Sequence, residues 1–403
     1  MASGKQSLVD LTGLDTLRGL LAVFVVAHHA RWLCWTGQAQ WRMTEHTWLP
    51  SAIANVTAVF RYGHEAVMVF FALSGFFIHL RAAKQFAVER QCERLNVRRF
   101  TKRRLHRLAA PYFLVLFLTF VLDSIGRHSF PSLYVGDTGN ALLDQNFSGG
   151  NYSARAVIPG LVMLPRSLGL TFGSNGPLWS LGYEVVYYAF YPLWLMVRRH
   201  SLWFAYLGIP FICFVIAGLS LGAWLPAVIS HWPIWIAGAG LAEWLMLRNH
   251  QISRRGGGTQ ALPKRDVAHW RNRFCLYGLA LTVVGFAGCQ ISQLPMAILL
   301  SYAVLGCGCV LSFCTLPTVI GGMKFFSAWQ FLGFRSYTIY ILHFPLLALM
   351  AAPYFQAGGP PSDGWFALAA AIATTLICVA VFELCERWFV HARIRVESRP
   401  EPT

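Results

Sequence analysis

Long apolar runs separated by short polar segments dominate the chain. Many of these runs approach the ~20 residues that a helix needs to cross a bilayer, and their residues do not alternate as barrel strands do. Because only helices and closed barrels satisfy the backbone in lipid, the pattern predicts an all-α polytopic transmembrane helix bundle. We predict about ten spans, at residues 11–33, 64–80, 108–125, 177–197, 202–222, 228–247, 274–291, 295–316, 331–351 and 364–385.

The charge distribution supports this topology. The chain has 403 residues, 12% of them charged, and a formal net charge of +16. A nucleic-acid partner is not expected, because the basic residues lie between the spans. With the N-terminus in the cytoplasm, the inner loops hold 25 Lys and Arg and the outer loops 5. Since cytoplasmic loops are enriched in these residues, both termini are predicted to be cytoplasmic.

We therefore expect an integral multi-pass protein of the cell (inner) membrane, in contact with membrane lipids. One transmembrane domain is predicted over residues 1–390, followed by a cytoplasmic tail over residues 391–403. The ten cysteines show no metal-like spacing, so no metal and no disulfide framework are expected.

Ionisable residues inside the first span are candidates for function, because charges in a bilayer are costly and mark functional sites by default. This span contains Asp15, Arg18, His28 and His29. Arg18 and His29 are eleven residues apart and share a helix face at 100° per residue, whereas His28 points about 100° away. The alternatives are a snorkelling anchor for Arg18 and a structural, packed histidine for His29.

Two later spans add titratable groups. Glu184 and His343 are placed in the outer halves of their spans, at a depth similar to that of His29. Pro345, two residues after His343, frees a backbone carbonyl nearby. An imidazole near a carboxylate suits general-base work on a hydroxyl. A proton relay in a proton-coupled membrane transporter is the alternative.

A basic stripe precedes the third span. Arg99, Arg103 and Arg107 repeat every four residues and would share one helix face, with Arg104 beside them. Cytoplasmic anchoring or contact with anionic lipid would explain such a stripe. A phosphate-rich cytoplasmic ligand is the sharper interpretation, because guanidinium groups bind phosphate well.

Five motifs occur in a fixed order over most of the chain. They are LDTLRG with a histidine eleven residues after its arginine, VFFALSGFFI, RRLHRLAAPY, LWSLGYEVVYY and SYTIYILHFPLL. In this order they resemble the membrane acyltransferase-3 family of integral membrane O-acyltransferases. Ala66 and Ala110 depart from the family pattern, but neither replaces a matched polar residue. The motifs add six supporting residues: Asp15, Ser74, Trp179, Ser180, Tyr188 and Tyr337.

The resemblance implies O-acylation, commonly O-acetylation, of a carbohydrate or other hydroxyl-bearing acceptor that is extracytoplasmic or lipid-linked. Cytoplasmic acetyl-CoA is the implied acyl donor and co-substrate. In our hypothesis His29 takes the proton of the acceptor hydroxyl or briefly carries the acyl group, and Glu184 orients its imidazole, directly or through His343. Four arginines would bind the donor phosphates: Arg18, Arg103, Arg104 and Arg107.

Overall fold

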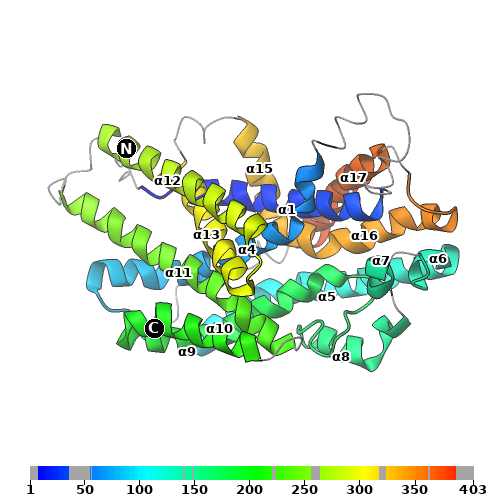
Figure 1. The fold of residues 1–403 in the computed structure, drawn as a ribbon, viewed down its shortest axis with the longest axis horizontal. Helices are drawn as coiled ribbons and strands as arrows, with labels where there is room; N and C mark the ends of the chain where they lie inside the picture. The colour runs from blue at the N-terminus through cyan, green and yellow to red at the C-terminus, as the bar shows by residue number, and fades with distance from the viewer. Residues whose placement is uncertain are drawn as a thin grey trace. The chain divides into compact units, whose positions relative to one another are not determined.

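The computed structural model describes residues 8–35, 55, 57–138, 141–147, 149–219, 224–255, 264–316, 324–361 and 364–386 (Figure 1). All regular elements in these residues are helical, so the predicted all-α class is confirmed. The predicted tail, 391–403, lies outside the described residues. The α-helices are α1 (Thr12–Leu33), α4 (Gly63–Glu89), α5 (Val97–Ser129), α6 (Pro131–Tyr134), α7 (Ala141–Asn146), α8 (Ala154–Leu161), α9 (Trp179–His200), α10 (Ile209–Leu219), α11 (Trp224–Arg255), α12 (Lys264–Ile291), α13 (Pro295–Cys314), α15 (Lys324–Phe334), α16 (Ser336–Gln356) and α17 (Trp365–Val381). The short 3-10 helices are η1 (Thr57–Arg61), η2 (Gly149–Tyr152) and η3 (Gly176–Leu178), and the short π helices are η4 (Phe204–Gly208) and η5 (Phe382–Glu386).

Seven helices in the described residues are long and apolar enough to cross a membrane, which confirms a multi-pass membrane protein. These are α4, α5, α11, α12, α13, α16 and α17, the last together with most of η5. The three other predicted spans coincide with α1 and α9, which carry polar and charged residues, and with the 11-residue α10. The number of ten crossings and the orientation of the termini therefore stay predictions.

One boundary differs from the sequence expectation. The predicted span 331–351 crosses a break between α15 and α16, and the apolar helix begins at Ser336. Arg335 lies at the break, where its guanidinium forms an ion pair with Glu383 of η5. The apolar run continues through the break, and the partner of Arg335 is 48 residues away in the sequence.

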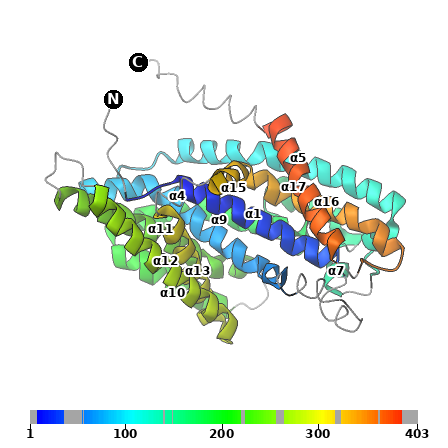
Figure 2. The same cartoon turned by 90° about the horizontal axis from the view of Figure 1, so that it is seen from above.

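The chain divides into two compact units. The first unit comprises Met1–Leu21, His64–Val97 and Val186–Phe334, and the second comprises Ala22–Gly63, Arg98–Val185 and Arg335–Thr403. In the first unit α11 contacts α10 and α13, and α12 and α13 lie side by side (Figures 1 and 2). In the second unit α16 contacts α6, α17 and η3, and most of its residues are buried.

Small residues allow helices of the first unit to touch backbone to backbone. A Cβ atom at Gly75 of α4 would lie 1.9 Å from the carbonyl oxygen of Trp235, and one at Gly238 of α11 would lie 1.9 Å from that of Ala72. Small residues at helix contacts are the usual means of close packing in membranes, where lipid tails are as apolar as the side chains. This reciprocal contact fixes α4 against α11.

Candidate active site

Two histidines from opposite ends of the sequence meet in the second unit. Nε2 of His343, on α16, lies 2.9 Å from Nδ1 of His29, on α1. The ring of His343 is completely buried, whereas His29 is half-buried. Two of the three residues expected to carry catalysis are therefore in direct contact.

The surroundings of His343 fix the proton positions in this pair. Its Nδ1 lies 2.6 Å from the carbonyl oxygen of Tyr340 and 3.2 Å from that of Ile339. Because a carbonyl can only accept, Nδ1 carries the proton and Nε2 of the neutral ring is an acceptor. Nδ1 of His29 therefore donates to Nε2 of His343. The neutral His29 ring keeps its lone pair on Nε2, which makes no hydrogen bond within the described residues.

The neighbouring His28 makes different contacts. Its Nδ1 lies 2.8 Å from the carbonyl oxygen of Phe60 in η1. Its ring also packs against Gly63, where an added Cβ would lie only 2.3 Å from a ring atom. His28 therefore holds η1 and the start of α4 in place, and this packing favours His29 as the residue that is available for chemistry.

A buried asparagine supports α16 next to His343. Pro345 cannot donate a backbone hydrogen bond, so the carbonyl of Ile341 loses its helical partner. The side-chain amide of Asn175 donates to this carbonyl at 2.8 Å, and Asn175 itself is completely buried. The sequence predicted a freed carbonyl near His343 but did not indicate the residue that satisfies it.

The loop that carries Asn175 is anchored by Asp123 of α5. The buried Asp123 carboxylate accepts hydrogen bonds from the Tyr152 hydroxyl at 2.6 Å and from the backbone and hydroxyl of Ser174, both at 2.7 Å. Burial and the adjacent carboxylate raise the pKa of Tyr152, so its hydroxyl stays protonated and donates. Gly173 has a φ of +59°, and a Cβ there would lie 2.5 Å from the carboxylate. Sequence reasoning missed Asp123, although an aspartate inside a predicted span is a signal of its own.

The third expected catalytic residue, Glu184, is not part of the histidine pair. Within the described residues the two imidazoles form hydrogen bonds with each other and with the carbonyls of Val25, Ile339 and Tyr340, and none of these bonds includes Glu184. The Tyr340 hydroxyl lies 2.6 Å from the Ser180 hydroxyl, one helical turn before Glu184. The role expected for Glu184, to orient the imidazole of His29 directly or through His343, stays a prediction.

Comparison with protein families identifies the family of the chain. A family model described as an acyltransferase domain, that of the acyltransferase-3 family, matches residues 11–383 and so includes all of the site residues above. The chain belongs to the acyltransferase-3 family. It is therefore a membrane acyltransferase, as the five motifs suggested. Searches of curated proteins and of solved structures found no significant match.

In this acyltransferase the predicted arginine stripe forms the first turns of α5. Arg103 and Arg104 are half-buried and Arg107 is exposed, and the Arg104 guanidinium lies 5.7 Å from the Phe100 ring centre. The Tyr337 hydroxyl donates to the carbonyl of Leu108 at 3.1 Å, which ties the first turn of α16 to α5 directly after the stripe. The helical form of the stripe is confirmed, and its ligand stays a prediction.

The remaining motif residues fall into local groups. In the first unit Asp15 and Arg18 form an ion pair at 3.7 Å. Also in that unit, the Ser74 hydroxyl lies 3.4 Å from that of Tyr188 and accepts a hydrogen bond from the Trp235 indole at 3.3 Å. In the second unit Trp179 packs edge-on against Tyr183, with ring centres 5.0 Å apart. Only the group around Ser74 joins different helices, α4, α9 and α11, and the supporting roles that the motifs imply stay predictions.

Proposed function

We propose that this membrane acyltransferase transfers an acetyl group from cytoplasmic acetyl-CoA to a hydroxyl of a carbohydrate or another extracytoplasmic or lipid-linked acceptor, with His29 as the general base. The observation that carries the proposal is the histidine pair, which leaves the lone pair of His29 Nε2 free for a proton.

In the proposed reaction, Nε2 of His29 takes the proton of the acceptor hydroxyl as its oxygen attacks the thioester carbonyl. The C–S bond breaks, an ester forms, and the leaving thiolate receives the proton from His29. The positive charge on His29 during this cycle is stabilised by His343, because Nε2 of His343 accepts from Nδ1 of His29 in both charge states. A positioned base of this kind typically contributes 10²–10⁴-fold in rate.

The donor phosphates are assigned to the basic turns of α5. Arg103, Arg104 and Arg107 present guanidinium groups within two helical turns, and guanidinium forks match the geometry of phosphate oxygens. Arg18 was expected to assist them, but its pairing with Asp15 lowers the net charge that it can offer.

Acyl transfer by the purified protein tests the proposal. Radiolabelled acetyl-CoA is supplied with extracted surface glycans or lipid-linked sugars, and CoA release is followed together with base-labile label in the acceptor. The proposal predicts equal amounts of both products. Absence of CoA release with every acyl-CoA tested would overturn it. A third outcome is label that stays on the wild-type protein when acceptor is omitted but is absent from His29→Ala. This outcome would show that His29 carries the acyl group as an acyl-histidine intermediate and is not the general base.

A further inference from the structure

The first unit contains a basic pocket that the proposed acyl transfer does not use. Its volume is about 670 Å³, and it lies between the end of α4, the segment that follows it, and the last turns of α9. Five of its lining side chains are arginine or histidine, and none of those described is acidic: Arg90, Arg94, Arg198, Arg199 and His200. A concave surface with this charge favours an anionic ligand.

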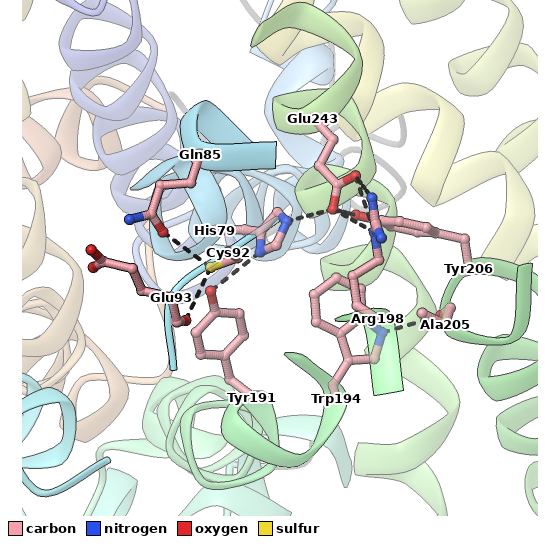
Figure 3. A network of polar contacts seen from close by, with 10 residues as sticks. All are labelled: His79, Gln85, Cys92, Glu93, Tyr191, Trp194, Arg198, Ala205, Tyr206 and Glu243. Atoms are coloured by element: carbon pink, nitrogen blue, oxygen red, sulfur yellow. Dashed lines mark hydrogen bonds and ion pairs between the residues drawn. The ribbon is translucent and has the colours of Figure 1, made fainter. Parts of the chain in front are cut away.

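One arginine of the pocket is rigidly held (Figure 3). Nε and Nη2 of Arg198 donate to the Glu243 carboxylate of α11 at 2.8 and 2.6 Å. The same carboxylate also accepts from the Tyr206 hydroxyl at 2.8 Å and binds Nε2 of the fully buried His79 at 2.7 Å. The third nitrogen of Arg198, Nη1, makes no hydrogen bond within the described residues. This network therefore fixes a guanidinium in the pocket wall with one donor group to spare.

A second arginine occupies a backbone conformation that favours glycine. Arg90, directly after α4, has a φ of +56°, and the left-handed conformation after a helix is usually taken by glycine. Arginine is less favourable than glycine in this conformation, so the turn alone does not explain why an arginine occupies the position. Its side chain lines the pocket, and the only acidic residue in the adjoining segment 90–97, Glu93, lies 3.9 Å from Arg81.

The rest of the pocket wall is apolar. Phe86, Leu195 and Met196 lie beside the basic residues, and the exposed side chains of Leu193 and Met196 continue this apolar surface on α9. A small soluble anion would gain nothing from such a wall, whereas a lipid would place its phosphate on the arginines and its chains on the apolar side. The basic residues of the pocket lie in segments 81–107 and 198–201, which are predicted to face the cytoplasm. On that side of the membrane, anionic lipids bind basic pockets between helices.

We propose that this pocket binds the phosphate headgroup of an anionic phospholipid from the cytoplasmic leaflet. The pocket lining shares no residue with those assigned to acyl transfer, and its proposed ligand is not a reactant. The bound lipid would link α4 to α9 and neutralise the arginines that line the pocket.

Native mass spectrometry of the full-length, delipidated protein tests this site. The protein is titrated with phosphatidylglycerol and, separately, with phosphatidylcholine. Wild type should retain one phosphatidylglycerol with a preference of about tenfold or more, and the double variant Arg90→Gly/Arg94→Gln should lose about tenfold or more of that affinity, because charged hydrogen bonds dominate the contact. Arg90→Gly should fold well, since glycine suits the φ of +56°. Arg254→Gln, which removes an exposed charge elsewhere in the first unit, should bind like wild type.

Two outcomes of the lipid titration would contradict the proposal. Equal retention of the two lipids, or unchanged phosphatidylglycerol binding by the double variant, would overturn the proposal. A third arm adds glycerol 3-phosphate, which has the phosphate ester without the chains. Displacement of phosphatidylglycerol at similar concentrations of the soluble ester would assign the pocket to a soluble phosphate ester and overturn the lipid source.

Discussion

His343 should act through the charge on His29, and the two roles of its ring can be separated by substitution. Nε2 of His343 accepts the hydrogen bond from His29 Nδ1 at 2.9 Å, while its Nδ1 only binds carbonyls of its own helix. His343→Leu removes this acceptor, leaves Nδ1 of His29 only the Val25 carbonyl at 3.1 Å, and keeps a side chain of similar size. His343→Gln returns an acceptor oxygen at a reach similar to that of Nε2.

The size of the effect follows from this one hydrogen bond. A hydrogen bond to a charged group contributes roughly 1.5–3 kcal/mol, and every 1.36 kcal/mol in the barrier is tenfold in rate. His343→Leu should therefore lower kcat by roughly 10- to 150-fold, whereas His343→Gln should lower it by less than about tenfold. The donor KM should stay unchanged in both, because the loss affects only the charged state.

The assay is steady-state CoA release by the purified variants, with thermal unfolding measured on the same samples. Full activity of a well-folded His343→Leu protein would refute the charge-stabilising role. Equal losses in the Leu and Gln variants would show that His343 serves packing alone.

Three further predictions address other parts of the molecule. Arg103→Ala or Arg107→Ala should raise the donor KM about tenfold, because each removes a charged hydrogen bond; an unchanged KM in the well-inserted double variant would return the stripe to membrane anchoring. Glu243→Ala should destabilise the protein by about 3–5 kcal/mol, because it leaves Arg198 and His79 without their partner, and thermal melts that match wild type would contradict this. Reporter fusions after Asn249 and at the C-terminus should both report the cytoplasm, and opposite reports would exclude an even number of spans.

Much of the helix pattern could be predicted because it depends on local sequence. The apolar runs gave the α class and the positions of α4, α5, α11, α12, α13 and α17. The break before α16 was not predicted, because the apolar run continues through it, and the ion pair of Arg335 with Glu383 at this point joins residues far apart in the sequence. A prediction from hydropathy alone treats the two helices as one continuous span.

The sequence predicted the depth of the site residues in the bilayer but not the helix face on which each side chain lies. His29 and His343 are 314 residues apart, and their predicted depths in the bilayer sufficed to place them together. The same reasoning put Glu184 at that depth, but depth along a helix does not set the face on which a side chain lies, and the hydrogen bonds of the histidine pair do not include Glu184. Asp123, His79 and Glu243 were missed since none belongs to a motif, although each lies inside a predicted span, where a titratable group is itself a signal.

The most direct test of the account compares acetyl transfer by purified His29→Ala and His28→Ala, side by side. His29 offers a free Nε2, whereas His28 is held by the Phe60 carbonyl. His29→Ala should lose at least ~100-fold of transfer activity while folding normally, and His28→Ala should lose far less. An inactive, well-folded His28→Ala beside an active His29→Ala would contradict the assignment of His29 as the base.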